Sequence, residues 1–453
     1  MALFDWARGA TGFKRGFTNF VKRNLFRCVP KKGRFALYRS FFKCDQTLPE
    51  DLTFKIAETQ EEIEACLALL HDAYVSSGFM KRDHSGLRVT VFHALPTTTT
   101  LCAKIGDRVV GTLSLIREGP FGFPLQKVFD LQALREKTGA IAEVSALAVH
   151  RCYRRQGGYI LFPLMKFMYE YCVTLFDVRH LVIAVNPRHI EMYESLLFFK
   201  RLQASPVESY DFVNGAAAVG ATLDLSEASK IYKRVYRSRP PEKNLHHYFT
   251  KLKLPNIRLP ARRFFTTNDP VMTPALLDYF FNVRTACFKS LGDRDRARLH
   301  MIYDMPEYRK ILPTFSGYSM ESRLRHHARF SYKCPGVFSF VTKRGKRTQV
   351  AIEVIEVSRS GFVASVSHWP GFSEDQRGEV EVRLGLNEVS RSPSRALRDL
   401  KHGLYAFHID APDLIWRKFA SSVFRGSIMN DLDNATQFLE TSSCLLESLS
   451  VAL

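Results

Sequence analysis

Glu143 is an acidic residue at the start of a stretch that otherwise has the composition of a buried strand. The apolar run that follows it, residues 144–149, reads VSALAV. Burying a carboxylate costs free energy unless the group has a partner or a catalytic role. Glu143 is therefore interpreted either as a general base or as a residue paired with a nearby arginine at the end of the sheet.

A basic loop that contains glycine follows this strand directly. Residues 151–158 read RCYRRQGG, which places Arg154 and Arg155 beside Gly157 and Gly158. Small residues let the backbone approach a ligand closely, and a helix that begins here would add N–H donors and a favourable dipole for an anion. The loop is predicted to bind a phosphate, and an ordinary turn on a basic surface is the alternative.

The elements around these residues alternate between strand and helix from about residue 52. One α/β domain with a mixed sheet is expected over residues 51–225. Its strands are predicted at 53–57, 100–105, 108–116, 143–149 and 181–185, with a further pair at 207–213 and 219–224. Its helices are predicted at 59–76, 158–176 and 187–199.

The rest of the chain has a different pattern. A basic, helical linker is expected over residues 226–318, with a helix start at Thr273-Pro274. Short strands separated by glycine, proline and polar clusters then predict a small β-barrel over residues 319–426. These strands include 336–342, 347–357, 361–367 and 380–384, and a C-terminal helix is expected over 427–453.

Basic charge is concentrated in two segments of the chain. The net charge is +20, and residues 1–44 hold eleven Lys or Arg against Asp5 alone, whereas residues 226–263 hold eleven against two Glu. Residues 1–50 are interpreted as a basic arm, with an amphipathic helix from Phe13 to Leu25. This helix either packs on its own domain or docks on an acidic partner, a carrier protein or an anionic membrane surface. Nucleic acid ranks last as a partner because no recognised binding module is found.

The cysteine spacing and the hydropathy of the sequence argue against a disulfide-rich, zinc-binding or membrane-spanning protein. Nine cysteines are scattered without zinc spacing, so reduced thiols and no metal site are expected. No apolar run reaches the length of a membrane span, and no signal peptide is found at the N-terminus. We expect a cytoplasmic protein. The basic arm also allows peripheral attachment to the inner face of the membrane.

Residues 53–225 resemble the N-acyl amino acid synthase branch of the GNAT acyltransferase superfamily. The resemblance rests on the order and spacing of several short motifs: Ser85–Arg88, His93–Pro96, Gly111–Ser114, Ala142–Val149 and Asn186–His189 with Tyr193. It implies a sheet whose strands 143–149 and 181–185 splay apart, leaving a gap for the pantetheine arm of an acyl donor.

The resemblance also implies roles for individual residues. Glu143 would be the general base and Tyr193 the group that protonates the leaving thiolate. Arg88 and His93 would bind the acceptor. The donor would be held by Leu147, Val149, Arg154, Arg155, Gly157 and Gly158.

Two positions depart from the family pattern. Related enzymes usually carry Arg where Ala146 stands, and a third small residue where Tyr159 stands. The loosened loop at Tyr159 favours acyl carrier protein, which presents a single phosphate and an acidic surface, over acyl-CoA as the donor.

Residues 321–424 resemble a PilZ domain, which implies a six-stranded β-barrel that binds cyclic di-GMP. The resemblance rests on Arg325 and Arg329, followed by Glu356, Ser358 and Gly361. Guanidinium groups stack on guanine or hold its O6/N7 edge, and a loop with serine and glycine can close over the ligand. Glu356 departs from the Asp or Asn of the motif, and a solvated arginine-rich linker is the alternative reading.

Together these patterns predict an acyltransferase that moves a fatty acyl group from acyl carrier protein to an amine, with an amino acid as the expected acceptor and cyclic di-GMP as the regulator. No tightly bound cofactor is expected. Two alternatives stay open, a non-catalytic cyclic di-GMP receptor with a degenerate GNAT domain and an acetyl-CoA-dependent N-acetyltransferase. Ala146 and Tyr159 favour the receptor.

Overall fold

The computed structural model describes most of the chain between residues 29 and 424. The described ranges are 29–119, 121–154, 158–260, 265–266, 269–270, 272–303, 306–314, 330–342, 344–366, 369, 371–384, 389–401 and 403–424. The chain forms two compact units, which meet in sequence at Leu259 and Pro260.

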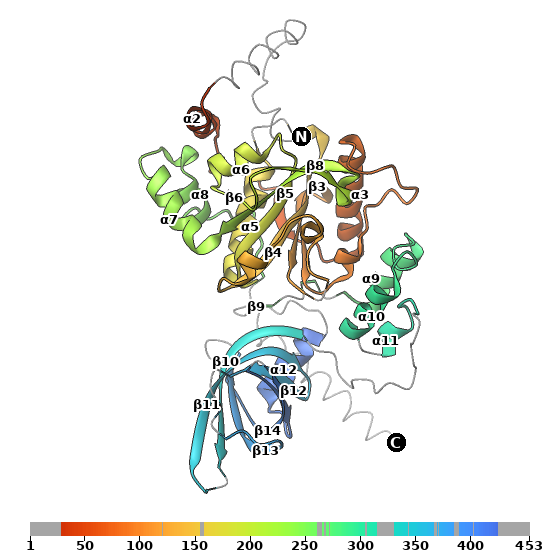
Figure 1. The fold of residues 1–453 in the computed structure, drawn as a ribbon, viewed down its shortest axis with the longest axis vertical. Coiled ribbons are helices and arrows are strands. Elements are labelled where there is room, and N and C mark those ends of the chain that lie inside the picture. Colours follow the sequence, from red (N-terminus) through yellow and green to blue (C-terminus); the bar gives the residue numbers. More distant parts are fainter. Residues whose placement is uncertain are drawn as a thin grey trace, which may run out of the picture. The chain divides into compact units, whose positions relative to one another are not determined.

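The N-terminal unit is built on a mixed sheet (Figure 1). The strand order is β1-β2-β3-β4-β5-β8-β6, and β7 pairs with β8. The strands are β1 (Leu52–Ile56), β2 (Thr98–Ile105), β3 (Arg108–Arg117), β4 (Ala140–Val149), β5 (Val178–Val185), β6 (Lys200–Arg201), β7 (Val207–Tyr210) and β8 (Ala216–Asp224). Among these pairs β4 and β5 are parallel, whereas the others are antiparallel.

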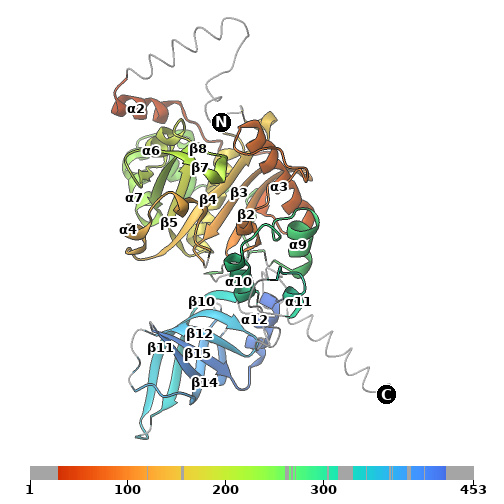
Figure 2. The ribbon, with the colours of Figure 1, turned by 45° about the vertical axis from the view of Figure 1, so that its right-hand side comes forward.

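Helices α3 (Gln60–Ser76) and α5 (Leu161–Thr174) cover opposite faces of this sheet, and Figure 2 shows α3 beside β2 and β3. Cys102 of β2 lies within hydrogen-bonding reach of Cys66 on α3. Thr99, three residues earlier on the same strand, contacts the Tyr171 hydroxyl of α5 at 3.1 Å. Because side chains alternate along a strand, these two contacts place the helices on different faces.

Residues 225–259 pack as part of the N-terminal unit, so the predicted linker 226–318 is divided between the two units. Helices α7 (Leu225–Tyr236) and α8 (Leu245–Thr250) form this segment. The hydroxyls of Tyr232 and Tyr236 donate to the carbonyls of Leu197 and Leu196. The buried ammonium of Lys166 donates to Tyr248 O at 2.7 Å. Tyr232 and Tyr236, four residues apart on α7, are buried on one face of the helix, which explains why this basic segment packs on the N-terminal unit.

Helix α2 (Lys31–Phe41) contacts α6 (Ile190–Leu196), although it belongs to the segment predicted as an arm. Arg34 Nε donates to Glu191 at 3.0 Å, and Lys31 pairs with Glu194 at 3.1 Å. The amphipathic helix predicted from Phe13 to Leu25 lies outside the described residues.

The C-terminal unit contains short helices and a closed β-barrel. The helices are α9 (Pro274–Asp278), which continues into a π-helical turn (Tyr279–Val283), α10 (Asp293–Ile302) and α11 (Pro306–Arg309). The barrel strands are β10 (Phe330–Val341), β11 (Arg347–Ser358), β12 (Gly361–Ser365), β13 (Gln376–Arg383), β14 (Val389–Lys401) and β15 (Leu404–Ile409). The order β11-β12-β15-β14-β13-β10 closes through a β10–β11 pairing, and β9 (Phe265–Thr266) adds to β10.

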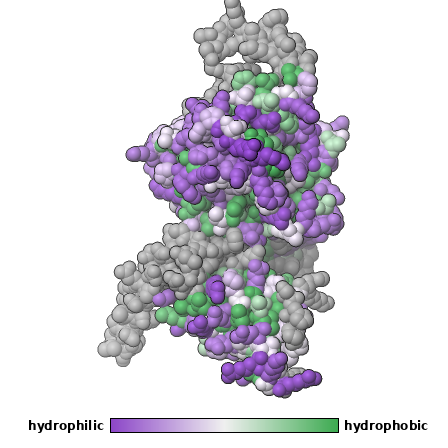
Figure 3. Space-filling model, turned by 90° about the vertical axis from the view of Figure 1, so that its left-hand side faces the viewer, coloured by the Kyte–Doolittle hydropathy of each residue, from purple (hydrophilic) through white to green (hydrophobic). Residues whose placement is uncertain are grey.

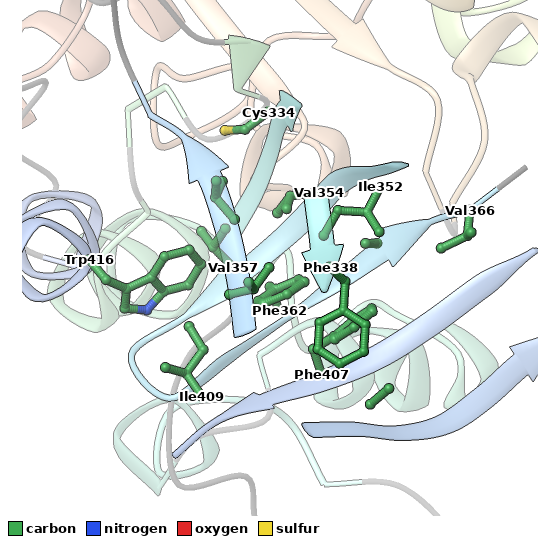
Figure 4. Packing of buried hydrophobic residues seen from close by; sticks show 14 of the residues in the cluster. Cys334, Phe338, Ile352, Val354, Val357, Phe362, Val366, Phe407, Ile409 and Trp416 are labelled. Atoms are coloured by element: carbon green, nitrogen blue, oxygen red, sulfur yellow. The ribbon is translucent and has the colours of Figure 1, made fainter. Parts of the chain in front are cut away.

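Aromatic side chains fill the barrel interior (Figure 4). Phe362 stacks on Phe407 with ring centroids 4.6 Å apart. Trp416 of helix α12 (Leu414–Phe424) is fully buried and lies 5.8 Å from Phe362. The barrel is therefore the six-stranded fold predicted from sequence. No described helix is long and apolar enough to cross a membrane.

Candidate active site

Strands β4 and β5 separate in the middle of the N-terminal sheet. Their parallel pairing runs from Ala140 to Glu143 on β4 and stops there, and β5 continues paired with β8 as far as Val185. Beyond Glu143, strand β4 stays paired with β3 but carries a bulge at Ala146, whose φ is +54°. A positive φ is strained for alanine, and bulges of this kind re-aim the chain near functional sites. The predicted splay is present.

A cavity of about 230 Å³ passes through this gap. On the face that carries α3 it is lined by Tyr74, Tyr210 and Phe212, and Glu143 interacts electrostatically with both tyrosines. On the face that carries α5 it is lined mainly by apolar and aromatic residues, Leu161, Met165, Met168, Tyr169, Leu223, Leu225, Tyr232 and Phe249. One end of the cavity therefore offers polar groups, and the other end fits a hydrocarbon chain.

Glu143 is buried in this cavity. Its side chain is 3% exposed, and its Oε2 accepts a hydrogen bond from the backbone N–H of Leu125 at 3.1 Å. No described residue forms an ion pair with it, which weighs against the arginine-paired interpretation. Burial raises the pKa of Glu143 to about 8, and the Leu125 hydrogen bond opposes that shift. A carboxylate with a pKa near neutrality suits a general base.

Helix α6 brings two further titratable groups to the cavity, Tyr193 and His189. Burial raises the pKa of Tyr193 to about 12, so its hydroxyl keeps its proton at neutral pH and can donate it. Burial lowers the pKa of His189 to about 4, so its imidazole is neutral. Tyr193 was predicted as a catalytic residue, whereas His189 was noted only as part of a motif.

The predicted donor residues are placed at the end of β4 and the start of α5. Leu147, Val149 and Arg154 line the cavity, and Arg154 Nε donates to Val149 O at 2.7 Å. Gly158 has φ +88°, and a Cβ there would come within 2.4 Å of Phe162, so this position requires glycine. Arg155 and Gly157 lie outside the described residues.

The two predicted acceptor residues lie behind the cavity wall. Arg88 is buried between the rings of Tyr74 and Phe212, with its Cζ at 4.1 and 4.9 Å from the ring centroids. His93 Nδ1 accepts a hydrogen bond from the Thr90 backbone at 3.1 Å, and burial lowers the pKa of His93 to about 4. Neither side chain lines the cavity.

Tyr74 and Tyr210 line the polar end of the cavity, and sequence reasoning missed both. Tyr74 lies near the C-terminal end of α3, and Tyr210 ends the short strand β7. Aromatic residues on an amphipathic helix or at a strand end are usually core residues, so no sequence signal separates these two from the rest.

The barrel presents a tight turn at the predicted nucleotide motif, between β11 and β12. Ser358 Oγ donates to Gly361 O at 3.0 Å, and a Cβ at Gly361 would come within 2.3 Å of Phe407 O. The indole N–H of Trp416 lies 3.2 Å from the carbonyls of Ser358 and Arg359. Glu356 is partly buried two residues before this turn. Arg325 and Arg329 lie outside the described residues.

Comparisons with known proteins find one family model that matches part of the N-terminal unit. Residues 65–224 match the family model of the N-acyl amino acid synthase FeeM. No curated protein sequence matches the chain. Within the described residues no cluster of His, Cys, Asp or Glu could hold a metal ion.

Three solved structures illustrate the likeness. FeeM, an N-acyl amino acid synthase from uncultured soil microbes, is 23% identical over 40% of this chain and 94% of its own, with a TM-score of 0.35. The CoA-dependent acyl-homoserine lactone synthase BjaI is 20% identical over 46% of this chain and 92% of its own, with a TM-score of 0.32. The PilZ domain of YcgR from Escherichia coli, solved with c-di-GMP, is 14% identical over 22% of this chain and 88% of its own, with a TM-score of 0.18. The N-terminal region of this chain is therefore similar, over residues 65–224, to the FeeM family of N-acyl amino acid synthases, and a closed six-stranded barrel follows it.

Proposed function

We propose that the N-terminal unit transfers a fatty acyl group from an acyl-phosphopantetheine thioester to the amine of an amino acid. The observation that carries this proposal is the buried carboxyl of Glu143, which forms no ion pair with a described residue and lies in a cavity that passes between β4 and β5. Acyl carrier protein is the proposed donor, and cyclic di-GMP is the proposed regulator through the barrel.

The chemistry follows from the groups around the cavity. The amine attacks the thioester carbon while Glu143 accepts a proton from the attacking nitrogen, directly or through water. The C–N bond forms, and the C–S bond breaks as the tetrahedral intermediate collapses. Tyr193 donates a proton to the departing thiolate and is later reprotonated from solvent. The products are an N-acyl amino acid and free phosphopantetheine thiol.

Analysis of lipid extracts tests the proposal. Cells that produce the full chain should accumulate an N-acylated amino acid that mass spectrometry detects, and cells that produce the Glu143→Gln variant at the same level should not. An extract without a new N-acyl product, from cells with abundant folded protein, would favour a receptor with an inactive acyltransferase domain.

Aromatic rings beyond the family-matching range close the apolar end of the cavity, and we expect them to limit acyl length. Phe249 lies 5.8 Å from Tyr232 and 5.5 Å from Tyr169, measured between ring centroids. Phe249→Ala should shift the preferred donor towards longer chains, because each methylene accommodated contributes roughly 1 kcal/mol. The measurement is kcat/KM over a series of acyl-pantetheine donors.

Phe167→Ala is the matched control for this prediction. Phe167 is also a fully buried phenylalanine, on α5, but it does not line the cavity. Its loss should lower stability without changing the order of donor preference. The same order of preference in Phe249→Ala and the wild type would remove Phe249 as a length determinant.

The basic arm is proposed to attract the acidic carrier protein. Residues 1–28 hold six Lys or Arg against Asp5. The face that includes α7 is also largely hydrophilic (Figure 3), and Lys230, Lys233, Arg234 and Arg237 are exposed there. Two basic segments on one unit would add to each other in steering an acidic partner.

Removing residues 1–28 is therefore expected to weaken carrier-protein binding and to flatten its salt dependence. Helix α2 must be kept, because its contacts with Glu191 and Glu194 support the helix that carries Tyr193. Transfer from a short pantetheine donor should be unchanged. A full-length variant with the six basic residues changed to glutamine separates charge from length. Unchanged carrier affinity but weaker binding to anionic vesicles would identify the membrane as the partner.

A further inference from the structure

Tyr210 carries a buried hydroxyl that has no hydrogen-bond partner among the described residues. The residue is 2% exposed and lines the cavity beside Glu143. Its ring stacks on Phe212 at 5.8 Å, which fixes the direction of the hydroxyl. A buried donor left unpaired costs about 1–3 kcal/mol, so a group in this position is best explained by a ligand that completes its hydrogen bonding.

Arg88 supplies a positive charge directly behind this wall. It is 9% exposed, its Nη2 donates to Phe212 O at 2.7 Å, and its guanidinium lies over the Tyr74 ring. Among the described residues no carboxylate lies within ion-pairing distance of it. A buried cation without a counter-ion makes the adjacent space favourable for an anion.

The charge of Arg88 acts on the two tyrosines of the polar end. It interacts electrostatically with Tyr74 and Tyr210, and its Cζ lies 4.1 Å from the centroid of the Tyr74 ring. Glu143, the acidic group near both tyrosines, holds its proton at neutral pH and adds little opposing charge. The polar end of the cavity therefore offers tyrosine hydroxyls as hydrogen-bond donors and has a positive electrostatic potential from Arg88. It lies next to Glu143, the proposed general base.

We propose that the Tyr210 hydroxyl, with Tyr74 beside it, binds the carboxylate of the acceptor amino acid, and that Arg88 stabilises this anion from behind the tyrosines. The inference rests on the proposed acyl transfer to an amino acid and adds to it the side chains that recognise the carboxylate of that acceptor. Tyr74 and Tyr210 touch the substrate, whereas Arg88 is a positioning residue.

Tyr210→Phe tests the inference, because it removes only the hydroxyl. The wild-type full chain should use leucine and phenylalanine far better than isoamylamine and phenethylamine, which lack only the carboxylate. The variant should raise KM for the amino acids by roughly tenfold or more, the usual effect of losing a hydrogen bond to a charged group. The values of kcat/KM for the two amines should not change.

Tyr248→Phe is the matched control. The Tyr248 hydroxyl is also buried and unpaired among the described residues, but Tyr248 does not line the cavity. The control variant should leave KM for every acceptor unchanged. Equal losses with amino acids and amines in Tyr210→Phe would assign the hydroxyl to the reacting thioester and overturn the inference.

A binding measurement separates this inference from the proposed function. Leucine or phenylalanine should raise the Tm of the wild-type chain more than the matching amine does, and Tyr210→Phe should lose that difference. Tyr210-dependent binding without any acyl product would reject the proposed function and keep the inference. If acyl transfer is observed and KM for the amino acids is the same in the wild type and in Tyr210→Phe, the proposed function is kept and the inference about Tyr210 is rejected.

Discussion

Glu143→Gln is expected to lower kcat/KM for acyl transfer by roughly 100-fold, the usual scale for the loss of a general base. Glutamine has nearly the same shape, and its amide oxygen can still accept the hydrogen bond from Leu125. What it cannot do is take the proton from the attacking amine. Turnover near the wild-type level with saturating donor would remove Glu143 from the mechanism.

The pH dependence of the wild type should report the same group. The pKa of Glu143 is raised from 4.5 to about 8 by burial, so the carboxylate that acts as base becomes abundant only as the pH rises through that value. The rate should therefore rise with pH up to about 8. In Glu143→Gln this titration should disappear, which separates it from ionisation of the acceptor amine.

Stability should change in the opposite direction to activity. A carboxyl with a raised pKa keeps its proton in the folded state while the unfolded chain releases it, so wild-type stability falls as the pH rises from about 4.5 towards about 8. Glu143→Gln does not ionise and escapes this loss. Its Tm should exceed that of the wild type near pH 8 and converge with it near pH 4, as thermal unfolding can measure. A lower Tm at pH 8 would mean that the lost activity reflects damaged folding.

The sequence predicted the sheet and drew attention to Glu143 because both depend on local pattern. Periodic apolar runs define β2 to β5, and an acidic residue at the start of one of them is conspicuous. The surroundings of Arg88 were not predicted: the structure places Tyr74 and Tyr210 in the cavity wall, with Arg88 behind them. Tyr74 belongs to α3 and Tyr210 to β7. These elements are brought together only by the tertiary fold, so the spacing of the two residues in the sequence does not predict that they lie close together.

Strand β14 shows a different reason for a missed element. Its inward-facing residues are Ser390, Ser392, Ser394 and Ala396, all fully buried. Because these side chains are small or polar, the sequence does not show the alternation of apolar and polar residues that predicts a strand. Pro393 has no N–H to donate to a neighbouring strand, so it also counts against a strand. The serine hydroxyls are satisfied inside the barrel, for example by Ser390 Oγ donating to Asp413 at 3.0 Å. Packing against large aromatic residues allows this small-residue strand.

Cyclic di-GMP binding is expected to be lost in Arg325→Ala and in Arg329→Ala. The two arginines lie outside the described residues, so the expectation rests on their sequence pattern and on the turn that follows β11. That turn is fixed by the Ser358 hydrogen bond to Gly361 and by the Trp416 indole. A preformed turn lowers the ordering cost of binding, whereas the permanently charged, planar guanidinium groups supply contacts that alanine cannot replace.

Arg347→Ala is the control for charge alone. Arg347 is an exposed arginine at the opposite end of β11, twelve residues long, which places it roughly 35 Å from the motif. Its loss should leave nucleotide affinity unchanged. Glu356→Asp should tighten binding or leave it unchanged, because aspartate restores the shorter side chain of the motif.

Calorimetry on the full chain measures the binding, and the acyl-transfer rate with and without nucleotide measures the coupling. A regulator shifts an equilibrium only by its differential affinity for two arrangements, typically about 1–3 kcal/mol, so a change in rate of roughly 5- to 150-fold is the expected range. The response should vanish in both arginine variants. A folded wild-type chain that shows no heat with cyclic di-GMP at high micromolar concentration would reject the sensing role, and the barrel would then be a docking domain.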